Sequence, residues 1–303
     1  MGHHGGVAEL DLEPNVKDTA LIFEGGGMRA AYTAAAVAAM VKARVELDWV
    51  AGISAGSTNL ANYLSRDPVR ARRSFVGLAR DPEMGSLKTW LEGDGLFNAN
   101  YIYQHTSEPG QTLPFKWDVF EKNPAEFRVG SFRADDGQMI YWGRGDIEER
   151  QDFLLRVQAS STMPVFMPPV EIDGQTYVDG ALGPSGGIAL DAAKAAGYEK
   201  FLVVLTRGRD YVKGPFRAGA VTRRVFKDFP AVTEALTQRP GNYNRTREEL
   251  FDLEADGKAY VYAPTGYTVS NQERRIPRLK RSYAEGAAQA RAEMPAIKEF
   301  LGL

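Results

Sequence analysis

Short apolar runs alternate with longer helical patterns along the first 65 residues. Residues 20–23 form an apolar run that leads into glycines 25–27, and the alanine-rich stretch 30–43 predicts a helix buried on several sides. A second apolar run, 49–51, leads into another glycine-containing turn, and we expect a helix to follow to about Leu64. A strand, a tight glycine turn and a helix, repeated twice, predict an α/β fold with a parallel sheet.

The middle of the chain mixes hairpins with helices. Asp135-Asp136-Gly137 and Asp173-Gly174 are turn signals, and each lies between two alternating runs that predict paired strands. The expected strands are 128–132, 139–142, 170–172 and 176–178, followed by a buried strand at 201–205; the expected helices are 148–159 and 188–197. Beyond Arg207 the sequence is mostly charged and helical, with one more strand near 260–262. No linker separates this C-terminal third from the rest.

The composition excludes several classes of protein but does not indicate a particular reaction. The 303 residues carry a net charge of −2, so nothing draws the whole chain to nucleic acid or to an anionic membrane. There is no cysteine, which excludes disulfides, a thiol nucleophile and thiolate metal sites. Residues 1–14 lack the features of a signal peptide, and the longest apolar run, 34–41, is far shorter than the roughly 20 residues that span a bilayer. We expect a cytoplasmic protein whose residues 1–18, including His3 and His4, form a flexible leader.

The second glycine turn has the pattern of a nucleophile elbow. Gly52-x-Ser54-x-Gly56 follows a predicted strand and precedes a predicted helix, which is the context that the motif requires. The turn is so sharp that the residues two before and two after the serine must be small. It presents the Ser54 hydroxyl at a helix N-terminus, where developing negative charge is favoured. The alternative is a glycine-cushioned turn with an inert serine.

A base for Ser54 has to be sought among residues other than histidine. Only His105 follows Ser54, and it lies in a stretch, 101–108, that we interpret as a polar surface loop. The base should therefore be a carboxylate or a lysine. Among the carboxylates, Asp136 and Asp173 sit at hairpin tips, and Asp94 and Asp256 precede glycines in loops; Asp179 ends a strand and is followed by small residues. That position makes Asp179 one candidate among several.

The first glycine turn predicts an anion-binding loop. Three glycines at the start of a helix let backbone N–H groups face a ligand without obstruction by Cβ atoms. The loop could be an oxyanion hole, or it could bind a dinucleotide, since Gly25-x-Gly27-x-x-Ala30 satisfies that fingerprint. The acidic residues at the required spacing, Glu46 and Asp48, precede the second strand rather than follow it, so we favour the oxyanion hole.

Together these residues resemble the patatin-like phospholipase family. That family carries a Gly-Gly-Gly-x-Arg loop, a Gly-x-Ser-x-Gly elbow and a later Asp-Gly-Ala or Asp-Gly-Gly. Here the three motifs read Gly25-Gly26-Gly27-Met28-Arg29, Gly52-Ile53-Ser54-Ala55-Gly56 and Asp179-Gly180-Ala181, in the family's order. The stretch from Ala159-Ser160-Ser161 to Asp179 also resembles the family. The sequence departs from the pattern at Ala30, where glycine is usual, and at 183–187.

The resemblance implies a fold, a reaction and a set of site residues. The fold is a three-layer α/β/α sandwich with a mainly parallel central sheet, comprising a hydrolase domain at 19–210 and a mainly helical region at 211–303 packed on it. The reaction is hydrolysis of carboxylic esters of lipids. Ser54 is the nucleophile and Asp179 its base. Gly25, Gly26, Gly27 and Arg29 make up the oxyanion loop, and no metal or cofactor is involved.

The substrate and partners are less well defined by the sequence. Residues 207–227 carry seven basic residues and one acidic one, interleaved with aromatic residues, which fits a lid or a transient membrane contact as well as a solvated surface. The basic run 274–281 is interpreted as a solvated helix face. Two other functions stay open, a dinucleotide-binding oxidoreductase and a catalytically silent lipid-binding module.

Overall fold

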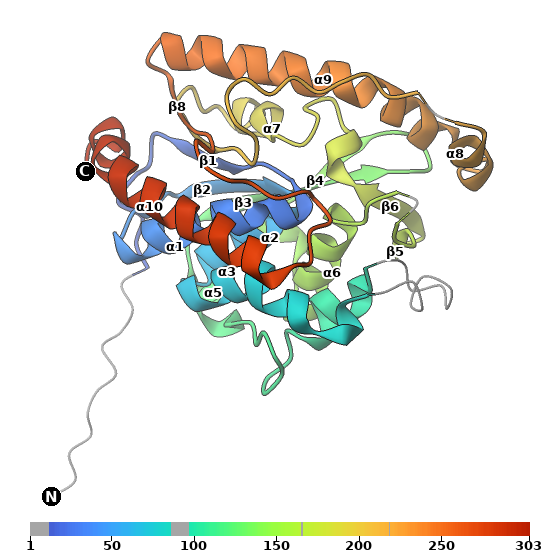
Figure 1. Ribbon diagram of the computed structural model, residues 1–303, viewed down its shortest axis with the longest axis horizontal. Coiled ribbons are helices and arrows are strands. Elements are labelled where there is room, and N and C mark those ends of the chain that lie inside the picture. Colours follow the sequence, from blue (N-terminus) through green and yellow to red (C-terminus); the bar gives the residue numbers. More distant parts are fainter. Residues whose placement is uncertain (1–11, 86–96, 165, 218) are drawn as a thin grey trace, which may run out of the picture.

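The protein is built on an eight-stranded sheet (Figure 1). The computed structural model describes residues 12–85, 97–164, 166–217 and 219–303, so most of the expected leader, with His3 and His4, and Asp94 lie outside the described residues. The order of the strands is β5-β6-β3-β2-β1-β7-β8, and β4 pairs with β3 off this path.

The centre of the sheet is parallel and one end is antiparallel. The parallel strands are β1 (Ala20–Phe23), β2 (Trp49–Ile53), β3 (Glu126–Arg133), β7 (Phe201–Val204) and β8 (Ala259–Tyr262). Strands β4 (Met139–Trp142), β5 (Val170–Ile172) and β6 (Gln175–Asp179) form the antiparallel pairs. The predicted mainly parallel sheet is confirmed, and both predicted hairpins form.

Helices cover both faces of the sheet, which gives the predicted three layers (Figure 1). One face carries α1 (Ala30–Lys42), α2 (Ala55–Leu64), α3 (Pro68–Arg72), α5 (Trp117–Lys122), α6 (Arg150–Ser160) and α10 (Ile276–Leu301). The other carries α7 (Leu190–Ala195) and α9 (Pro230–Ala255), with α8 (Ala220–Val225) beside the end of α9. Strand β1 shows why both faces must be covered: Leu21 and Phe23 pack into the core on the α1 side, whereas Ala20 and Ile22 pack on the α7 side.

Short helical turns connect the larger elements. The 3₁₀ turns are η1 (Gly27–Arg29), η3 (Leu78–Arg80), η4 (Pro82–Met84), η6 (Arg144–Asp146) and η7 (Gly180–Leu182); η2 (Arg73–Gly77) and η5 (Tyr101–His105) are π-helical. The interpretation of 101–108 as a plain loop was therefore wrong for its first half. His105 is exposed there and stacks on Tyr101.

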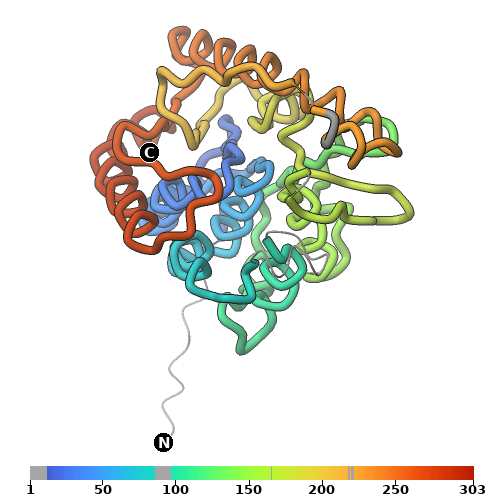
Figure 2. Tube along the Cα trace, turned by 45° about the vertical axis from the view of Figure 1, so that its right-hand side comes forward, coloured from blue at the N-terminus to red at the C-terminus, as the bar shows by residue number. Residues whose placement is uncertain are grey.

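The C-terminal third is integrated into the sheet and its helical layer. Strand β8 pairs with β7 and extends the sheet by one strand. Helix α10 lies along α1, so that the red end of the chain runs beside its blue beginning (Figure 2). This approach depends on small residues, because a Cβ atom on Gly286 would lie 2.4 Å from the Tyr32 carbonyl oxygen. Within the described ranges, no helix combines the length and apolar character needed to cross a membrane.

Candidate active site

Ser54 occupies a strained turn between β2 and α2. Its backbone angles, φ 56° and ψ −130°, lie outside the regions that an L-residue adopts without steric conflict. The flanking glycines permit the turn: a Cβ atom on Gly52 would lie 2.4 Å from the Gly56 carbonyl oxygen, and one on Gly56 would lie 2.1 Å from the Phe23 carbonyl oxygen. The predicted elbow is therefore present as a strand, a sharp turn and a helix.

Hydroxyl groups on both sides hold this turn in place. The Ser54 backbone N–H donates to Ser160 Oγ at 2.9 Å, and Ser160 Oγ donates in turn to the Gly130 carbonyl at 2.5 Å. Ser57 Oγ donates to the Ser54 carbonyl at 2.6 Å. Ser160 thus ties the elbow to β3. No local pattern in the sequence indicates this role. From the sequence, Ser160 was identified only as part of the stretch that resembles the family.

Asp179 ends β6 and faces Ser54. Its side chain accepts a hydrogen bond, 2.9 Å long, from the Ala181 N–H, and it lies close enough to Ser54 for the serine side chain to lower its pKa. Its backbone N–H donates to the Thr162 carbonyl at 2.8 Å, which fixes the strand end. Burial raises the pKa of Asp179, and the charge of Arg239, the Ala181 N–H and the Ser54 side chain act in the opposite direction. The carboxylate is consequently a stronger base than an exposed aspartate.

The glycine loop lies beside the same serine. A Cβ atom on Gly25 would meet Ser54 Cβ at 2.9 Å, and one on Gly26 would meet Thr206 Oγ1 at 2.5 Å. Gly27 has a positive φ of 55° and packs against the backbone of Asn271. Asn271, which follows β8, accepts from the Met28 N–H at 2.9 Å, so the C-terminal third supports the loop.

The N–H groups of this loop differ in their availability. Gly25 N–H donates to the Gly187 carbonyl at 3.2 Å, so this glycine shapes the loop. Across the described part of the chain, no hydrogen bond engages the N–H groups of Gly26 and Gly27. Although the sequence departs from the family pattern at 183–187, this segment still forms a hydrogen bond with the glycine loop, through the Gly187 carbonyl.

Arg29 is buried at the start of α1 and lines the space in front of Ser54. Its backbone N–H donates to the Gly26 carbonyl at 3.2 Å, but its side-chain Nε has no hydrogen-bond partner among the described residues. Burial lowers the pKa of Arg29, and the charge of Arg207 lowers it further. The side chain thus presents a desolvated positive charge near the reacting groups.

Two hollows of different character meet at Ser54, and both are lined by Gly27, Ser54, Met163 and Asn271. The first, of about 70 Å³, is mostly apolar; its further lining includes Met28, Phe75, Leu78, Met84, Phe97, Ile102 and Met167. The second, of about 340 Å³, also contains Asp179 and three cationic side chains, Arg29, Lys213 and Arg239. An ester placed at Ser54 would have an apolar side and a cationic side.

The basic segments singled out in the sequence have different surroundings. Residues 213–216, within the segment 207–227, line the cationic hollow, and Phe216 at its edge is 40% exposed. In the run 274–281, Arg275 and Arg278 are paired with Glu273 and Arg281 with Glu285, whereas Lys280 lines a separate surface groove. The first segment therefore borders the site, and the second does not line either hollow.

The remaining candidates lie away from Ser54. Asp136 is bound by Arg133 at a hairpin tip, Asp173 is exposed at another, and Asp256 follows α9. The two acids weighed for a dinucleotide precede β2: Glu46 is paired with Arg66, and Asp48 accepts from the Tyr198 hydroxyl at 3.0 Å. In the part of the chain that the structure describes, no three acidic or histidine side chains gather into a metal-binding group.

Several known proteins and family models match this chain. It is 26% identical over 208 residues to the uncharacterized protein YjjU of Escherichia coli K12, a match that covers 67% of this chain and 56% of that protein. VipD of Legionella pneumophila aligns with a TM-score of 0.49 at 12% identity, covering 94% of this chain and 67% of VipD. The sequence model of a domain of unknown function (DUF6363) matches residues 229–302. The model of the patatin-like phospholipases matches residues 21–190, more than half of the chain, and the protein belongs to the patatin-like phospholipase family.

Proposed function

We propose that this protein is a serine acyl hydrolase that cleaves carboxylic esters of lipids with Ser54 as nucleophile and Asp179 as base. The observation that carries the proposal is the placement of Ser54, held in a strained elbow, in the same hollow as the buried carboxylate of Asp179, close enough to lower the pKa of that carboxylate. Beside them lies a glycine loop with two N–H groups that make no hydrogen bond among the described residues. Membership of a family of lipid acyl hydrolases supports the same reaction class.

In the proposed mechanism, Asp179 accepts the hydroxyl proton as Ser54 Oγ attacks the ester carbonyl. The raised pKa of Asp179 favours this transfer. The negative charge that develops on the carbonyl oxygen is stabilised by the N–H groups of Gly26 and Gly27. Protonated Asp179 then gives its proton to the leaving alcohol, and a water molecule repeats the sequence to release the acid.

The apolar hollow is the proposed site of the acyl chain. The one charged side chain among its described lining residues, Arg70, is bonded internally, to Asn62 Oδ1 at 2.6 Å, the Leu113 carbonyl at 3.1 Å and Ser107 Oγ at 3.0 Å. Burial lowers the pKa of Arg70 to about 10, which still leaves it charged. Its hydrogen bonds are used within the protein, so the wall toward the hollow suits hydrocarbon.

Covalent labelling by a fluorophosphonate tests the proposal. We expect labelling of the wild-type protein, loss of labelling in Ser54→Ala and strong slowing in Asp179→Asn. Asp173→Asn makes the same chemical change at the exposed tip of the β5–β6 hairpin and should label at the wild-type rate. No labelling of the wild type between pH 5 and 9 would refute the hydrolase and favour a silent lipid-binding module, whereas binding of a dinucleotide would favour an oxidoreductase.

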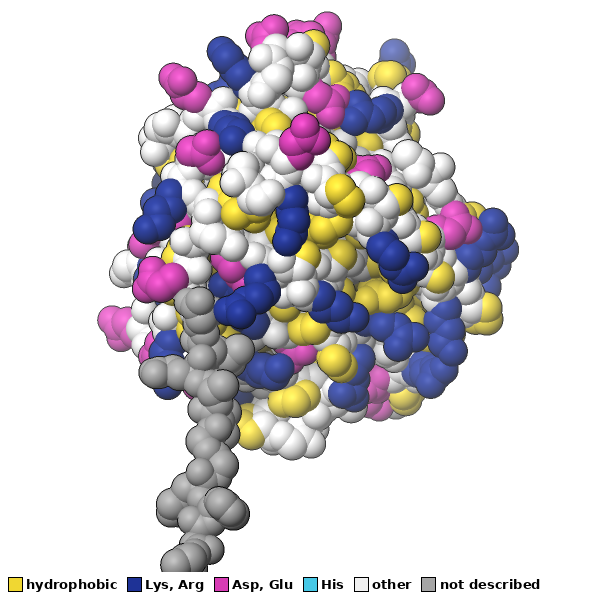
Figure 3. Space-filling view, turned by 90° about the vertical axis from the view of Figure 1, so that its left-hand side faces the viewer, with side chains coloured by type: hydrophobic (Ala, Val, Ile, Leu, Met, Phe, Trp, Pro, Cys, Tyr) yellow, Lys and Arg dark blue, Asp and Glu magenta, His cyan; other side chains and the backbone are white. Residues whose placement is uncertain are grey.

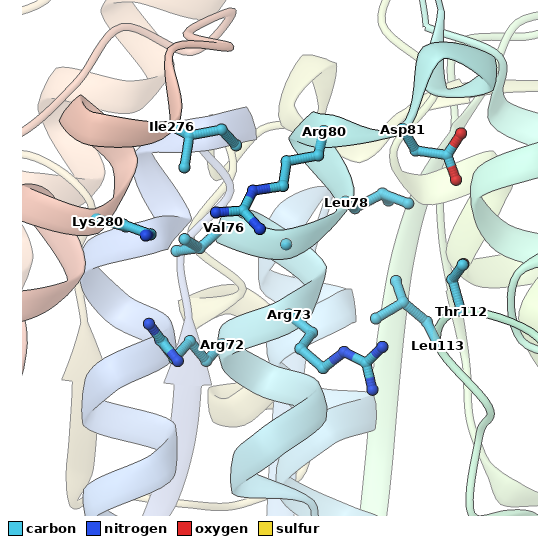
Figure 4. Close-up of a pocket in the computed structure, with 11 residues that line it drawn as sticks. Arg72, Arg73, Val76, Leu78, Arg80, Asp81, Thr112, Leu113, Ile276 and Lys280 are labelled. Atoms are coloured by element: carbon cyan, nitrogen blue, oxygen red, sulfur yellow. The ribbon is translucent and has the colours of Figure 1, made fainter.

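Transient contact with a membrane surface forms part of the proposal. A groove of about 510 Å³ is lined by the exposed cations Arg72, Arg73, Arg80 and Lys280, and Arg80 reaches across it toward Lys280 (Figure 4). Its walls include Leu78 and Leu113, which also line the apolar hollow. On the face where α10 lies, Lys and Arg side chains gather at one side of a hydrophobic centre (Figure 3). Cations around an apolar entrance suit an anionic lipid surface.

Vesicle sedimentation tests this contact separately from catalysis. Ser54→Ala protein should sediment with vesicles that contain anionic lipid and be released by salt, because exposed charges are screened. Charge reversal at Arg73 and Arg80 should abolish sedimentation, whereas reversal at the exposed Arg245 on α9 should not. Equal binding to neutral vesicles would contradict an electrostatic contact.

A further inference from the structure

The cationic hollow holds more positive charge than the protein itself neutralises. Arg29, Lys213 and Arg239 line it, and Arg207 is close enough to lower the pKa of both Arg29 and Lys213. Among the described residues none of these four side chains is in an ion pair with a carboxylate. The carboxylate within the lining is Asp179, which is committed to Ser54. Four cations therefore face two acidic groups, Asp179 and the nearby Glu24.

The hydrogen-bonding capacity of these cations is also unused. The Nε atoms of Arg29, Arg207 and Arg239 are buried without a partner among the residues that the structure describes. Glu24, the nearest compensating acid, is bound by the Tyr243 hydroxyl at 2.7 Å and by the Thr206 N–H. Buried guanidinium donors without acceptors are costly, and an anion bound in the hollow would supply acceptors that the described residues do not.

Lys213 responds to the same excess of charge. Burial lowers its pKa to about 8, and the charges of Arg239, Arg29 and Arg207 act in the same direction, against Glu24. The Lys213 Nζ lies over the Tyr243 ring at 4.9 Å, and its backbone N–H donates to Asn244 Oδ1 at 2.9 Å, so the side chain is held at the hollow by α9. An anion bound there would raise the pKa of Lys213 again.

We propose that this hollow is a phosphate subsite that selects acyl esters whose alcohol part carries a net negative phosphate group. The inference rests on the proposed function, in which the acyl chain occupies the apolar hollow and the leaving alcohol extends to the other side of Ser54. Two of the three lining cations, Lys213 and Arg239, come from outside the family match at 21–190. A zwitterionic headgroup would place its cation among Arg29, Lys213 and Arg239, with no free carboxylate in the described lining to receive it.

Turnover of matched lipids tests the selection. Esters with the same acyl chains and either a phosphomonoester, a phosphocholine or a free hydroxyl are compared in neutral detergent micelles, which removes attraction to a charged surface. We expect kcat/KM to be highest for the phosphomonoester. Lys213→Gln and Arg239→Gln should each lower the ratio of phosphomonoester to free-hydroxyl turnover by about tenfold, the effect of losing one charge-assisted hydrogen bond. Arg245→Gln, an exposed change on the same helix, should keep the wild-type ratio. Equal kcat/KM for the three esters would overturn the selection.

A binding measurement separates this inference from the hydrolase itself. Inorganic phosphate should raise the Tm of Ser54→Ala protein and, at pH 8, should bind with uptake of a proton that is lost in Lys213→Gln. Both effects are independent of turnover, so they would survive failure of the catalytic proposal. Phosphate binding without any preference among the esters would assign the hollow to free phosphate and overturn the headgroup role. Absence of phosphate binding to a folded protein that still labels with fluorophosphonate would overturn the subsite.

Discussion

The strain at the elbow predicts an inversion of an ordinary stability rule. Replacing alanine by glycine inside a regular element costs about 0.5–1 kcal/mol, because glycine has more conformational freedom to lose. Ser54, at φ 56° and ψ −130°, occupies backbone space that glycine enters freely but residues with a Cβ enter at a cost of about 1–3 kcal/mol. The free-energy cost of the strain exceeds the entropic cost of glycine, so a protein with glycine at position 54 should be more stable than one with alanine there.

The comparison is between Ser54→Gly and Ser54→Ala. Both variants lack the hydroxyl, so the difference in their stability isolates the effect of the Cβ atom. Subtracting the entropic cost from the strain, we expect Ser54→Gly to be more stable than Ser54→Ala by about 0.5–2 kcal/mol. For a chain of this size, that corresponds to a rise in Tm of about 1–4 °C.

Urea and thermal unfolding measure the difference, with Ala288→Gly as the control. Ala288 is exposed on α10, where glycine should destabilise by about 1 kcal/mol. The two sites should therefore give opposite signs. If glycine at position 54 lowered stability relative to alanine by as much as it does at position 288, the elbow would not be strained and the argument would be wrong.

Three further predictions concern the base, the turn and its support. Hydrolysis of a neutral ester should fall as pH decreases through the raised pKa of Asp179, since the protonated acid cannot accept a proton. Because the charge of Arg239 lowers this pKa, Arg239→Gln should move the acidic limb of the pH–kcat/KM profile to higher pH. A shift to lower pH would contradict the assignment of Asp179 as base. Gly56→Ala should lower the free energy of unfolding in urea by more than about 3 kcal/mol or prevent folding. Gly241→Ala, within α9 where a Cβ atom has space, should be neutral or stabilising. Similar effects of the two changes would refute the steric explanation of Gly56. Ser160→Ala should cost about 1–3 kcal/mol in stability and, under the proposed function, lower kcat, because the Ser54 N–H loses its acceptor; unchanged kinetics would contradict a positioning role for Ser160.

Local motifs could be predicted well because their chemistry is contained in a few consecutive residues. The elbow at Ser54 requires glycines two positions away on both sides, and the structure shows the backbone contacts that exclude any larger residue there. The short strand before each glycine turn was equally predictable, since a buried parallel strand reads as an uninterrupted apolar run.

Long-range partners could not be predicted from spacing. Asp179 was one of several carboxylates until the family resemblance selected it, because its approach to Ser54 depends on the antiparallel pairing of β6 with β3. Lys213, Arg239 and Asn271 were not singled out at all as site residues. Arg239 reaches the site on α9, Lys213 on the segment between β7 and α8, and Asn271 on the segment between β8 and α10, and no local pattern encodes how these elements pack.

The long-range contacts of residues 183–187, where the sequence departs from the family pattern, could not be predicted from spacing either. The structure shows that the Gly187 carbonyl accepts a hydrogen bond from the Gly25 N–H. Gly186 has a φ of 67°, and a Cβ atom added to it would lie 2.5 Å from the Tyr243 Cα. Gly186 is required by the close approach of the Tyr243 backbone, which is far away in sequence, and Gly187 is required by its φ of 114°. A departure from a family motif can therefore preserve the contact that the motif serves.

The support of the glycine loop by Asn271 has a consequence for how the protein is made. Synthesis releases Ser54 and the loop early, but the carbonyl that receives the Met28 N–H leaves the ribosome only after β8 has been translated. A nascent chain that has folded its first strands therefore still lacks the contact that sets the loop. Under the proposed function, esterase activity should therefore appear only late in translation.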